Sequence, residues 1–243
     1  MKNIIFLIPF YNEEKNLIEL TKFIKKSATH HGFVYKILFL NDCSSDNSFN
    51  IISNYSETNK LNNIIIHQND KNLGHGKSLL KLFELAQEYK DTATDVVTMD
   101  SDMRIEFDDF NEIFEFSESV ICKRKRFEEG IFRSLITLSA EFVVLIKTKK
   151  LWRDANCPLR LYKINTFKLI CDLIPNNILT PNIFSTIIII KSKLPVARKN
   201  IYLTYDTKNA GVTWQGKNPL NKYIKILNFS FKSLLEVMKI KIN

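Results

Sequence analysis

The stretch VVTMDSDM, residues 96–103, ends a short β-branched run in two carboxylates that are one residue apart. If residues 96–99 form a strand, Asp100 and Asp102 leave it on the same face, because side chains alternate along a strand. Charged carboxylates at the end of an apolar strand need a partner, since an unpaired one loses its hydration at high cost. Mg²⁺ or Mn²⁺ is such a partner, commonly held by one or two carboxylates and by substrate phosphates. A solvated strand end or a helix cap is the alternative for this pattern taken alone.

Three further apolar runs precede this stretch, and each is followed by a polar loop and a helical pattern. The expected strands are residues 4–8, 37–40 and 64–67, and the expected helices are residues 16–26, a segment that ends near residue 55, and residues 77–90. Four such units predict an α/β fold with a mostly parallel central sheet flanked by helices. Ligands bind at the carboxyl ends of such strands. The loops at residues 9–14, 41–48, 69–76 and 100–102 are therefore expected to form one binding edge.

Composition limits the class of protein and of partner. The chain has 243 residues, 45% of them hydrophobic, and a formal net charge of +9. This apolar content suits one large domain and argues against disorder. The positive charge favours an anionic partner, whether nucleic acid, phosphate-bearing substrate or lipid surface. The four cysteines have no C-x-x-C spacing, which argues against a zinc site and fits a reducing compartment.

Two of the polar loops contain motifs that have more than one interpretation. GHGKS at residues 74–78 is similar to a phosphate-binding loop, but Lys71 stands where the full pattern needs a glycine. A turn that caps the following helix is the plainer interpretation. Asp42 directly follows a strand, where a carboxylate accepts a hydrogen bond from a base N–H or from a ribose hydroxyl.

Taken together, the motifs resemble the family-2 glycosyltransferases, which have the GT-A fold. They are IPFYNEE at residues 8–14, LNDCSSDNS at 40–48, NLGHG at 72–76 and MDSD at 99–102. Within that family the chain is most similar to the dolichol- or polyprenyl-phosphate mannose/glucose synthase branch. DANCPLRLY at residues 154–162 is similar to the acceptor-side motif of this branch, with Pro158 in place of the usual turn glycine. KNAGVT at residues 208–213 resembles a later basic element, with Lys208 where arginine is more usual.

The resemblance implies a metal-dependent, inverting hexosyltransferase that uses a UDP- or GDP-linked sugar. Asp42 would contact the base or ribose, and Asp100 and Asp102 would hold Mg²⁺ or Mn²⁺ on the diphosphate, with Asp102 also counted as catalytic. The nucleotide-sugar-binding set that follows is Pro9, Tyr11, Glu13, Asp42, Asp100 and Ser101.

The implied acceptor is a polyprenyl phosphate, with a polysaccharide or other glycan as the alternative. Asp154 is the candidate catalytic residue on the acceptor side. It would be a general base toward a hydroxyl, but it would only orient an acceptor phosphate, which is already an anion. The run KRKR at residues 123–126 is either a solvated turn or an anion clamp. The candidate acceptor-phosphate residues are Arg124, Arg126, Arg133, Arg160 and Lys208.

The predicted catalytic domain comprises residues 1–215, with a nucleotide-binding half at 1–105 and an acceptor half at 106–215. Residues 216–243 have apolar side chains at three- and four-residue steps and many lysines. They are expected to form a basic amphipathic helix that lies on a membrane or packs on protein. Residues 131–147 are expected to be a core helix or a surface for an isoprenoid chain. Since no apolar run reaches the ~20 residues that span a bilayer, a cytoplasmic, peripheral membrane protein is predicted.

Two other classes remain as alternatives. A nucleotidyltransferase also uses paired acids and Mg²⁺, but its first loop is usually glycine-rich and basic. Here residues 9–14 contain acids and no glycine. A nucleic-acid-binding domain would fit the charge, but the sequence shows no recognition-helix or RNA-binding motif. No nucleic acid is therefore expected among the partners.

Overall fold

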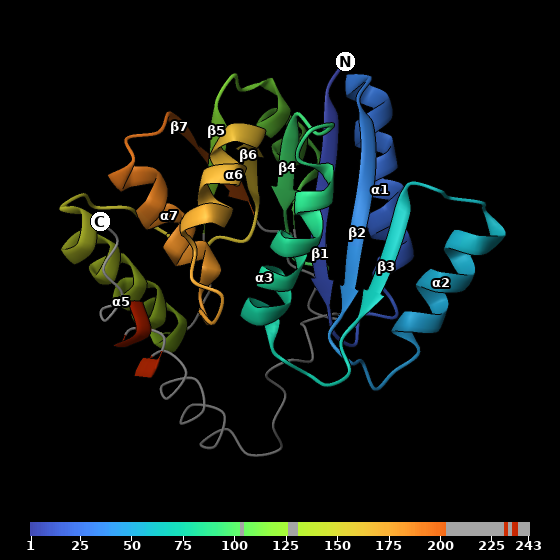
Figure 1. Cartoon of the computed structure of the whole chain (residues 1–243), viewed down its shortest axis with the longest axis horizontal. Coiled ribbons are helices and arrows are strands. Elements are labelled where there is room, and N and C mark those ends of the chain that lie inside the picture. The colour runs from blue at the N-terminus through green and yellow to red at the C-terminus, as the bar shows by residue number, and fades with distance from the viewer. Residues whose placement is uncertain (103–104, 126–130, 203–230, 233–234, 238–243) are drawn as a thin grey trace.

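The computed structural model describes residues 1–102, 105–125, 131–202, 231–232 and 235–237. These residues form a seven-stranded sheet in the order β3-β2-β1-β4-β6-β5-β7. All neighbouring strands are parallel except where β6 pairs with β4 and β5. The predicted α/β fold with a mostly parallel sheet is therefore confirmed (Figure 1). The strands are β1 (Asn3–Phe10), β2 (Val34–Asn41), β3 (Ile64–Gln68), β4 (Asp95–Thr98), β5 (Ser119–Lys125), β6 (Arg160–Lys163) and β7 (Val196–Tyr202).

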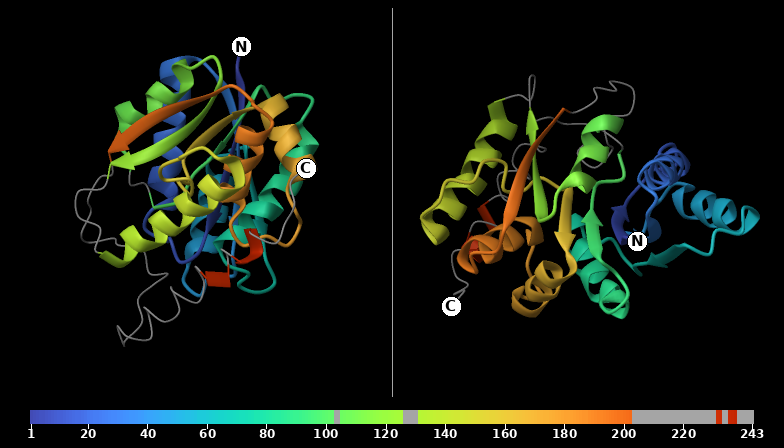
Figure 2. Two further views of the ribbon diagram at one scale, coloured as in Figure 1. Left: turned by 90° about the vertical axis from the view of Figure 1, so that its left-hand side faces the viewer. Right: turned by 90° about the horizontal axis from the view of Figure 1, so that it is seen from above.

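Helices cover both faces of the sheet (Figures 1 and 2). One apolar cluster joins a face of the sheet to α1, α2 and α4, and a second cluster joins the other face to α3, α5, α6 and α7. The helices are α1 (Leu17–His31), α2 (Ser48–Thr58), α3 (His75–Ala86), α4 (Phe107–Glu112), α5 (Ile131–Thr148), α6 (Ile164–Leu173) and α7 (Pro181–Lys191), with short 3₁₀ turns at Gln87–Tyr89 and Ile113–Glu115.

Strand β1 lies at the centre of the sheet, and its sequence explains this position. Ile4, Phe6 and Ile8 belong to one apolar cluster, whereas Ile5 and Leu7 belong to the other. A strand that is covered on both faces needs such a continuous apolar run. Its last residues, Pro9 and Phe10, bring the chain to the carboxyl edge of the sheet.

Proline is tolerated at the end of β1 because of the sheet's register. The Met99 N–H donates to the carbonyl of Leu7, so the odd residues of β1 direct their backbone groups toward β4. The paired part of β4 ends opposite Leu7. Pro9 lies beyond the last residue of β1 that pairs with β4. A proline there lacks an N–H, but no hydrogen bond of the sheet is lost.

The acceptor half differs from the sequence-based expectation. Residues 123–125 are not a charged turn but the end of β5, and β6, α4 and α6 were not predicted. The helix α7 at Pro181–Lys191 and the strand β7 at Val196–Tyr202 complete this half. Because β4 pairs with β6, one sheet runs through both predicted halves without interruption at residue 105.

Most of the predicted amphipathic C-terminal helix lies outside the described residues. Residues 231–232 and 235–237 are helical. Val237 is buried in the cluster that contains α5 and α7, and Glu236 accepts a hydrogen bond of 2.7 Å from the N–H of Leu179. This part of the segment therefore packs on the catalytic domain, which is one of the two alternatives that the sequence allows.

Gly76 permits a close contact between α3 and the chain that enters α7. A Cβ at this position would lie 2.0 Å from the carbonyl oxygen of Leu179. Because that oxygen belongs to the backbone, Gly76→Ala should force apart two packed elements and cost about 1–3 kcal/mol of unfolding free energy. Urea denaturation measures this loss, with Lys77→Ala as a control at the neighbouring exposed position. Equal stability of the two variants would contradict the contact.

Candidate active site

The carboxyl edge of the sheet brings together the loops that the sequence singles out. In the order β2-β1-β4, the residues after β2 and β4 are separated by the width of one strand. Asp42 and Asp102 therefore lie at the same edge, as predicted. The loops that follow β1 and β3 end at this edge too, since all four strands are parallel.

The loops after β1 and β2 are fastened to each other. The N–H of Asn12 donates to Ser44 Oγ over 3.0 Å, and Asn12 Oδ1 accepts a bond of 2.8 Å from the N–H of Ser45. The N–H of Glu13 donates to Ser48 Oγ over 2.7 Å. These bonds hold the two loops against each other.

Three residues of this edge have backbone angles that side chains rarely adopt. They are Asn12 (φ 55°), Cys43 (φ 59°) and Asp154 (φ 52°). The other non-glycine residues with positive φ directly follow, or lie two residues beyond, the ends of helices, where a left-handed residue is common. Strained residues away from helix ends are often found at functional sites. Their position in three different loops of one edge supports its assignment as the active site.

Asp42 anchors the loop after β3. Its side chain is buried, and Oδ1 accepts hydrogen bonds from the N–H of Leu73 (2.8 Å) and from Asn69 Nδ2 (2.9 Å). Oδ2 accepts from the N–H of Gly74 over 2.8 Å. Asp42 therefore fixes where α3 begins, and its contact with a base or ribose stays a prediction.

The two acids after β4 are accessible. Asp100 has a side chain that is 39% exposed, and its Oδ1 lies 3.7 Å from Nε2 of His75, the first residue of α3. Ser101 is buried and Asp102 is half-buried. No group of three or more potential ligand side chains occurs within the described ranges. The role of Asp100 and Asp102 as metal ligands therefore stays a prediction.

A buried ion pair lies at the carboxyl end of β5. Arg124 Nε and Nη2 donate to the two carboxylate oxygens of Asp154 over 2.9 and 2.7 Å, and the N–H of Arg124 adds a third bond of 3.0 Å. The side chains are 18% and 5% exposed. Burial by itself lowers the pKa of Arg124, but its hydrogen bonds and its attraction to Asp154 outweigh burial and raise the pKa well above the ordinary value. The guanidinium of Arg124 is therefore held in its charged form.

Glu141 supports this pair from α5. One of its carboxylate oxygens accepts a hydrogen bond of 2.9 Å from the N–H of Asp154, whose backbone is in the left-handed conformation. Sequence analysis missed this residue, and it missed Asn69, which bonds to Asp42. A signal for Glu141 was present, since it is the only acid between residues 131 and 148.

Arg160 does not face an acceptor, contrary to the prediction. It is fully buried, because its guanidinium donates to the backbone carbonyls of Ala155 and Cys157 and to Thr186 Oγ1. A phosphate has no access to such a side chain. Arg160 instead holds the loop that carries Asp154.

The remaining predicted residues are placed less fully. Pro9 is buried at the end of β1, and Tyr11 and Glu13 are half-buried in the loop after it. Arg133 belongs to the first turn of α5, without a described side chain. Arg126 and Lys208 lie outside the described residues.

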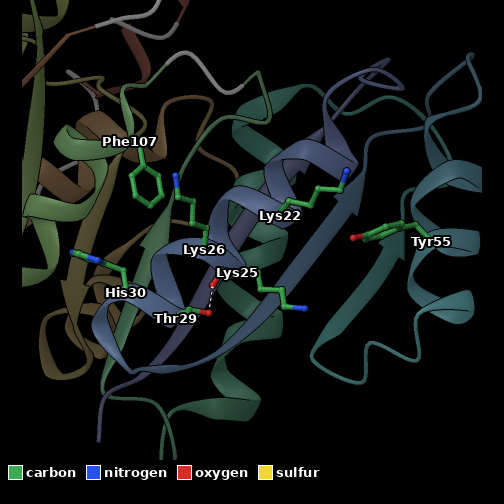
Figure 3. A pocket seen from close by; sticks show the side chains of 7 residues that line it. All are labelled: Lys22, Lys25, Lys26, Thr29, His30, Tyr55 and Phe107. Carbon is green, nitrogen blue, oxygen red and sulfur yellow. Dashed lines mark hydrogen bonds between the residues drawn. The ribbon is translucent and has the colours of Figure 1, made fainter.

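A hollow of about 530 Å³ on the outer face of α1 is separate from this edge. Figure 3 shows three lysines along it. Lys22 is paired with Glu19, and the ammonium of Lys26 lies 4.1 Å from the ring centre of Phe107. The site acids do not line this hollow. Its lining consists of Lys22, Lys25, Lys26, Thr29, His30, Tyr55 and Phe107.

Comparison with known proteins identifies the family. The sequence model described as glycosyl transferase family 2 matches residues 5–169. The chain belongs to glycosyl transferase family 2. This match covers β1 to most of α6, so it includes every described residue of the carboxyl-edge site.

Curated relatives match about two thirds of the chain. An undecaprenyl-phosphate 4-deoxy-4-formamido-L-arabinose transferase from Pectobacterium carotovorum is 24% identical over 167 residues, which are 67% of this chain and 49% of the relative. A protein of the same name from Klebsiella pneumoniae is also 24% identical over the same shares. The family-2 chain described here thus spans about half the length of the curated relatives it matches.

Solved structures agree on the GT-A fold. Mannosyl-3-phosphoglycerate synthase from Rubrobacter xylanophilus superimposes with a TM-score of 0.65 at 10% identity, covering 99% of this chain and 76% of the other. A mannosyltransferase from Pyrobaculum calidifontis, in complex with GDP-Man and Mn²⁺, gives a TM-score of 0.59 at 13% identity and covers 97% and 73%. At these low sequence identities, the two comparisons show that the family-2 chain shares the fold of these proteins and nothing more.

Proposed function

We propose that this chain transfers a sugar from a nucleoside-diphosphate sugar to a polyprenyl phosphate. The donor would bind at the loops after β1, β2 and β4, with Pro9, Tyr11, Glu13 and Asp42 around the nucleotide. Family membership and the names of the curated relatives support this reaction. The fold neighbours that bind GDP-Man or UDP support the donor class.

The proposal includes Mg²⁺ or Mn²⁺ at Asp100 and Asp102, with Ser101 beside the diphosphate. Two accessible carboxylates at a strand end fit a cation that shares its shell with phosphates. When bound, such an ion neutralises the negative charge that develops on the leaving nucleoside diphosphate. Asp42 contributes by fixing the Leu73–Gly74 peptides, and with them the start of α3 next to Asp100.

The hydrogen bonds of Asp154 favour a phosphate acceptor over a hydroxyl acceptor. Both of its carboxylate oxygens accept bonds from Arg124, so removing a proton from a hydroxyl would compete with that ion pair. A phosphate acceptor is already an anion and needs no base. Asp154 then orients Arg124 as a contact for the acceptor phosphate, and Arg126, Arg133 and Lys208 are proposed as further contacts. A glycan acceptor would instead need a free base.

A single displacement with inversion at the sugar is the mechanism that follows. A covalent intermediate would need a nucleophile on the protein, and the buried thiol of Cys157 lies close enough to Arg124 and Asp154 to interact with both. Burial raises the pKa of Cys157 to about 11, against an opposing effect of Arg124, so the thiol stays protonated at neutral pH. The carboxylate of Asp154, the other candidate nucleophile, is bonded to Arg124 through both oxygens, so in this proposal the acceptor oxygen attacks the sugar directly.

Two measurements test this function. Nucleoside diphosphates and their sugars should raise the melting temperature in the presence of Mn²⁺, because ligands stabilise the folded state by mass action. With a stabilising donor, sugar should be transferred to a polyprenyl phosphate but not to the same prenol without its phosphate. Equal transfer to the free alcohol would overturn the choice of acceptor, and no stabilisation by any nucleotide would overturn the donor.

A further inference from the structure

The outer face of α5 carries an apolar stripe that is exposed among the residues the structure describes. Leu138, Phe142, Leu145 and Ile146 are 57%, 59%, 37% and 37% exposed. Their spacing of four, seven and eight residues places them on one side of a helix. The opposite side holds Ala140, Val143 and Val144, which are buried in the core. The helix is thus apolar on two sides, of which the core uses one.

Exposed apolar side chains are concentrated at this place. Among the described residues, eleven large apolar side chains are exposed, and five of them lie on α5 or in the turn after it, where Leu151 is 56% exposed. Two more, Phe231 and Leu235, belong to the C-terminal segment beside α5 (Figures 1 and 2). Contiguous apolar patches of this kind mark contacts with a membrane or a protein.

The charge around the stripe distinguishes these partners. Lys149, Lys150 and Arg153 are exposed directly beyond the end of α5. The acid of this helix, Glu141, has its carboxylate engaged by the N–H of Asp154. The face therefore combines apolar side chains with positive charge, which suits the boundary between anionic headgroups and acyl chains.

We propose that α5 docks on the surface of an anionic lipid bilayer, with Phe142 and Leu145 inserted among the acyl chains. No helix in the described ranges is long and apolar enough to cross a membrane. Docking would leave α5 parallel to the bilayer, with Glu141 reaching inward to the Arg124–Asp154 pair. The use of this orientation to meet a lipid acceptor rests on the proposed function, but the docking itself does not.

Flotation of the full chain with vesicles tests the proposal. The wild type should float with vesicles of phosphatidylcholine and phosphatidylglycerol, less with phosphatidylcholine alone, and less in high salt. The double variant Phe142→Ser/Leu145→Ser should bind roughly tenfold more weakly or worse, because it loses the inserted apolar area. Both side chains are exposed, so folding should be unaffected. Val34→Ser/Leu173→Ser is the matched control, since these positions are 53% and 43% exposed elsewhere on the molecule.

Three outcomes would overturn the docking. The first is that the wild type does not bind anionic vesicles. The second is that the Phe142/Leu145 variant binds them as well as the wild type does. The third is that the Phe142/Leu145 and Val34/Leu173 variants lose vesicle binding equally. A wild-type dimer in light scattering that becomes a monomer in the Phe142/Leu145 variant, without vesicle binding, would assign the face to a second copy. The melting temperature of the same preparations is also measured with and without nucleotides. This tests donor binding independently of vesicle binding, so failure of the docking and failure of the proposed reaction can be told apart.

Discussion

Asp102→Ala should lower metal-dependent hydrolysis and transfer of a nucleotide sugar by about 10²–10³-fold. The leaving diphosphate builds negative charge, and an ion that neutralises it is worth several kcal/mol, with each 1.36 kcal/mol giving a factor of ten. Asp102 follows β4 at the carboxyl edge, half-buried beside the accessible Asp100. Initial rates over a range of Mn²⁺ concentrations measure the effect, which should persist at saturating metal.

The control for this variant is Asp91→Ala. Asp91 is also an acid close to β4 in the sequence, but it precedes the strand and so lies at the opposite edge of the sheet, with a side chain that is 79% exposed. Its replacement should leave the rates unchanged. If Asp102→Ala retained wild-type activity with an unchanged melting temperature, the metal role of this residue would be refuted.

Breaking the Arg124–Asp154 pair should have the largest effect on stability. Arg124→Ala leaves a buried carboxylate, and Asp154→Ala leaves a buried guanidinium, so each should cost about 3–5 kcal/mol of unfolding free energy. The double variant should lose much less than the sum, because no unpaired charge remains. Urea denaturation of the wild type, both single variants and the double variant gives the coupling energy.

A surface pair provides the comparison. Lys22 and Glu19 also lie 2.7 Å apart, but their side chains are 56% and 61% exposed. Solvent screens such a pair, so the same cycle there should give little coupling. Additive losses at Arg124 and Asp154 would show that the two side chains do not act as a unit, and would remove the support for an orienting role of Asp154.

The nucleotide-binding half was predictable because its sequence patterns are local. The strands at residues 4–8 and 37–40 are apolar on both faces, which is what a central parallel strand requires. The polar loops directly follow these runs, so their meeting at one edge follows from the parallel topology alone. Asp100 and Asp102 directly follow β4, so recognising this strand in the sequence was enough to place both acids at that edge.

The acceptor half was less predictable because its side chains depend on distant partners. Lys123 and Arg124 suggest a turn, but they lie in β5, where they pair with β7, and Asp154, thirty residues later, binds the arginine. Arg160 is charged and yet fully buried, since Ala155, Cys157 and Thr186 supply its acceptors. No spacing within the sequence reveals such pairings. Asp42 likewise anchors a loop, a role that its position after β2 does not distinguish from binding a ligand.

Two arginines, one in β5 and one in β6, hold the loop between α5 and β6 in place. Arg124 holds Asp154, while Arg160 holds backbone carbonyls at residues 155 and 157. Ala155 and Cys157 are themselves fully buried, so the loop keeps its aspartate and these two side chains, whereas residues 151, 153 and 156 are exposed. The exposed positions should therefore tolerate foreign residues, which makes them the places at which to redesign acceptor preference.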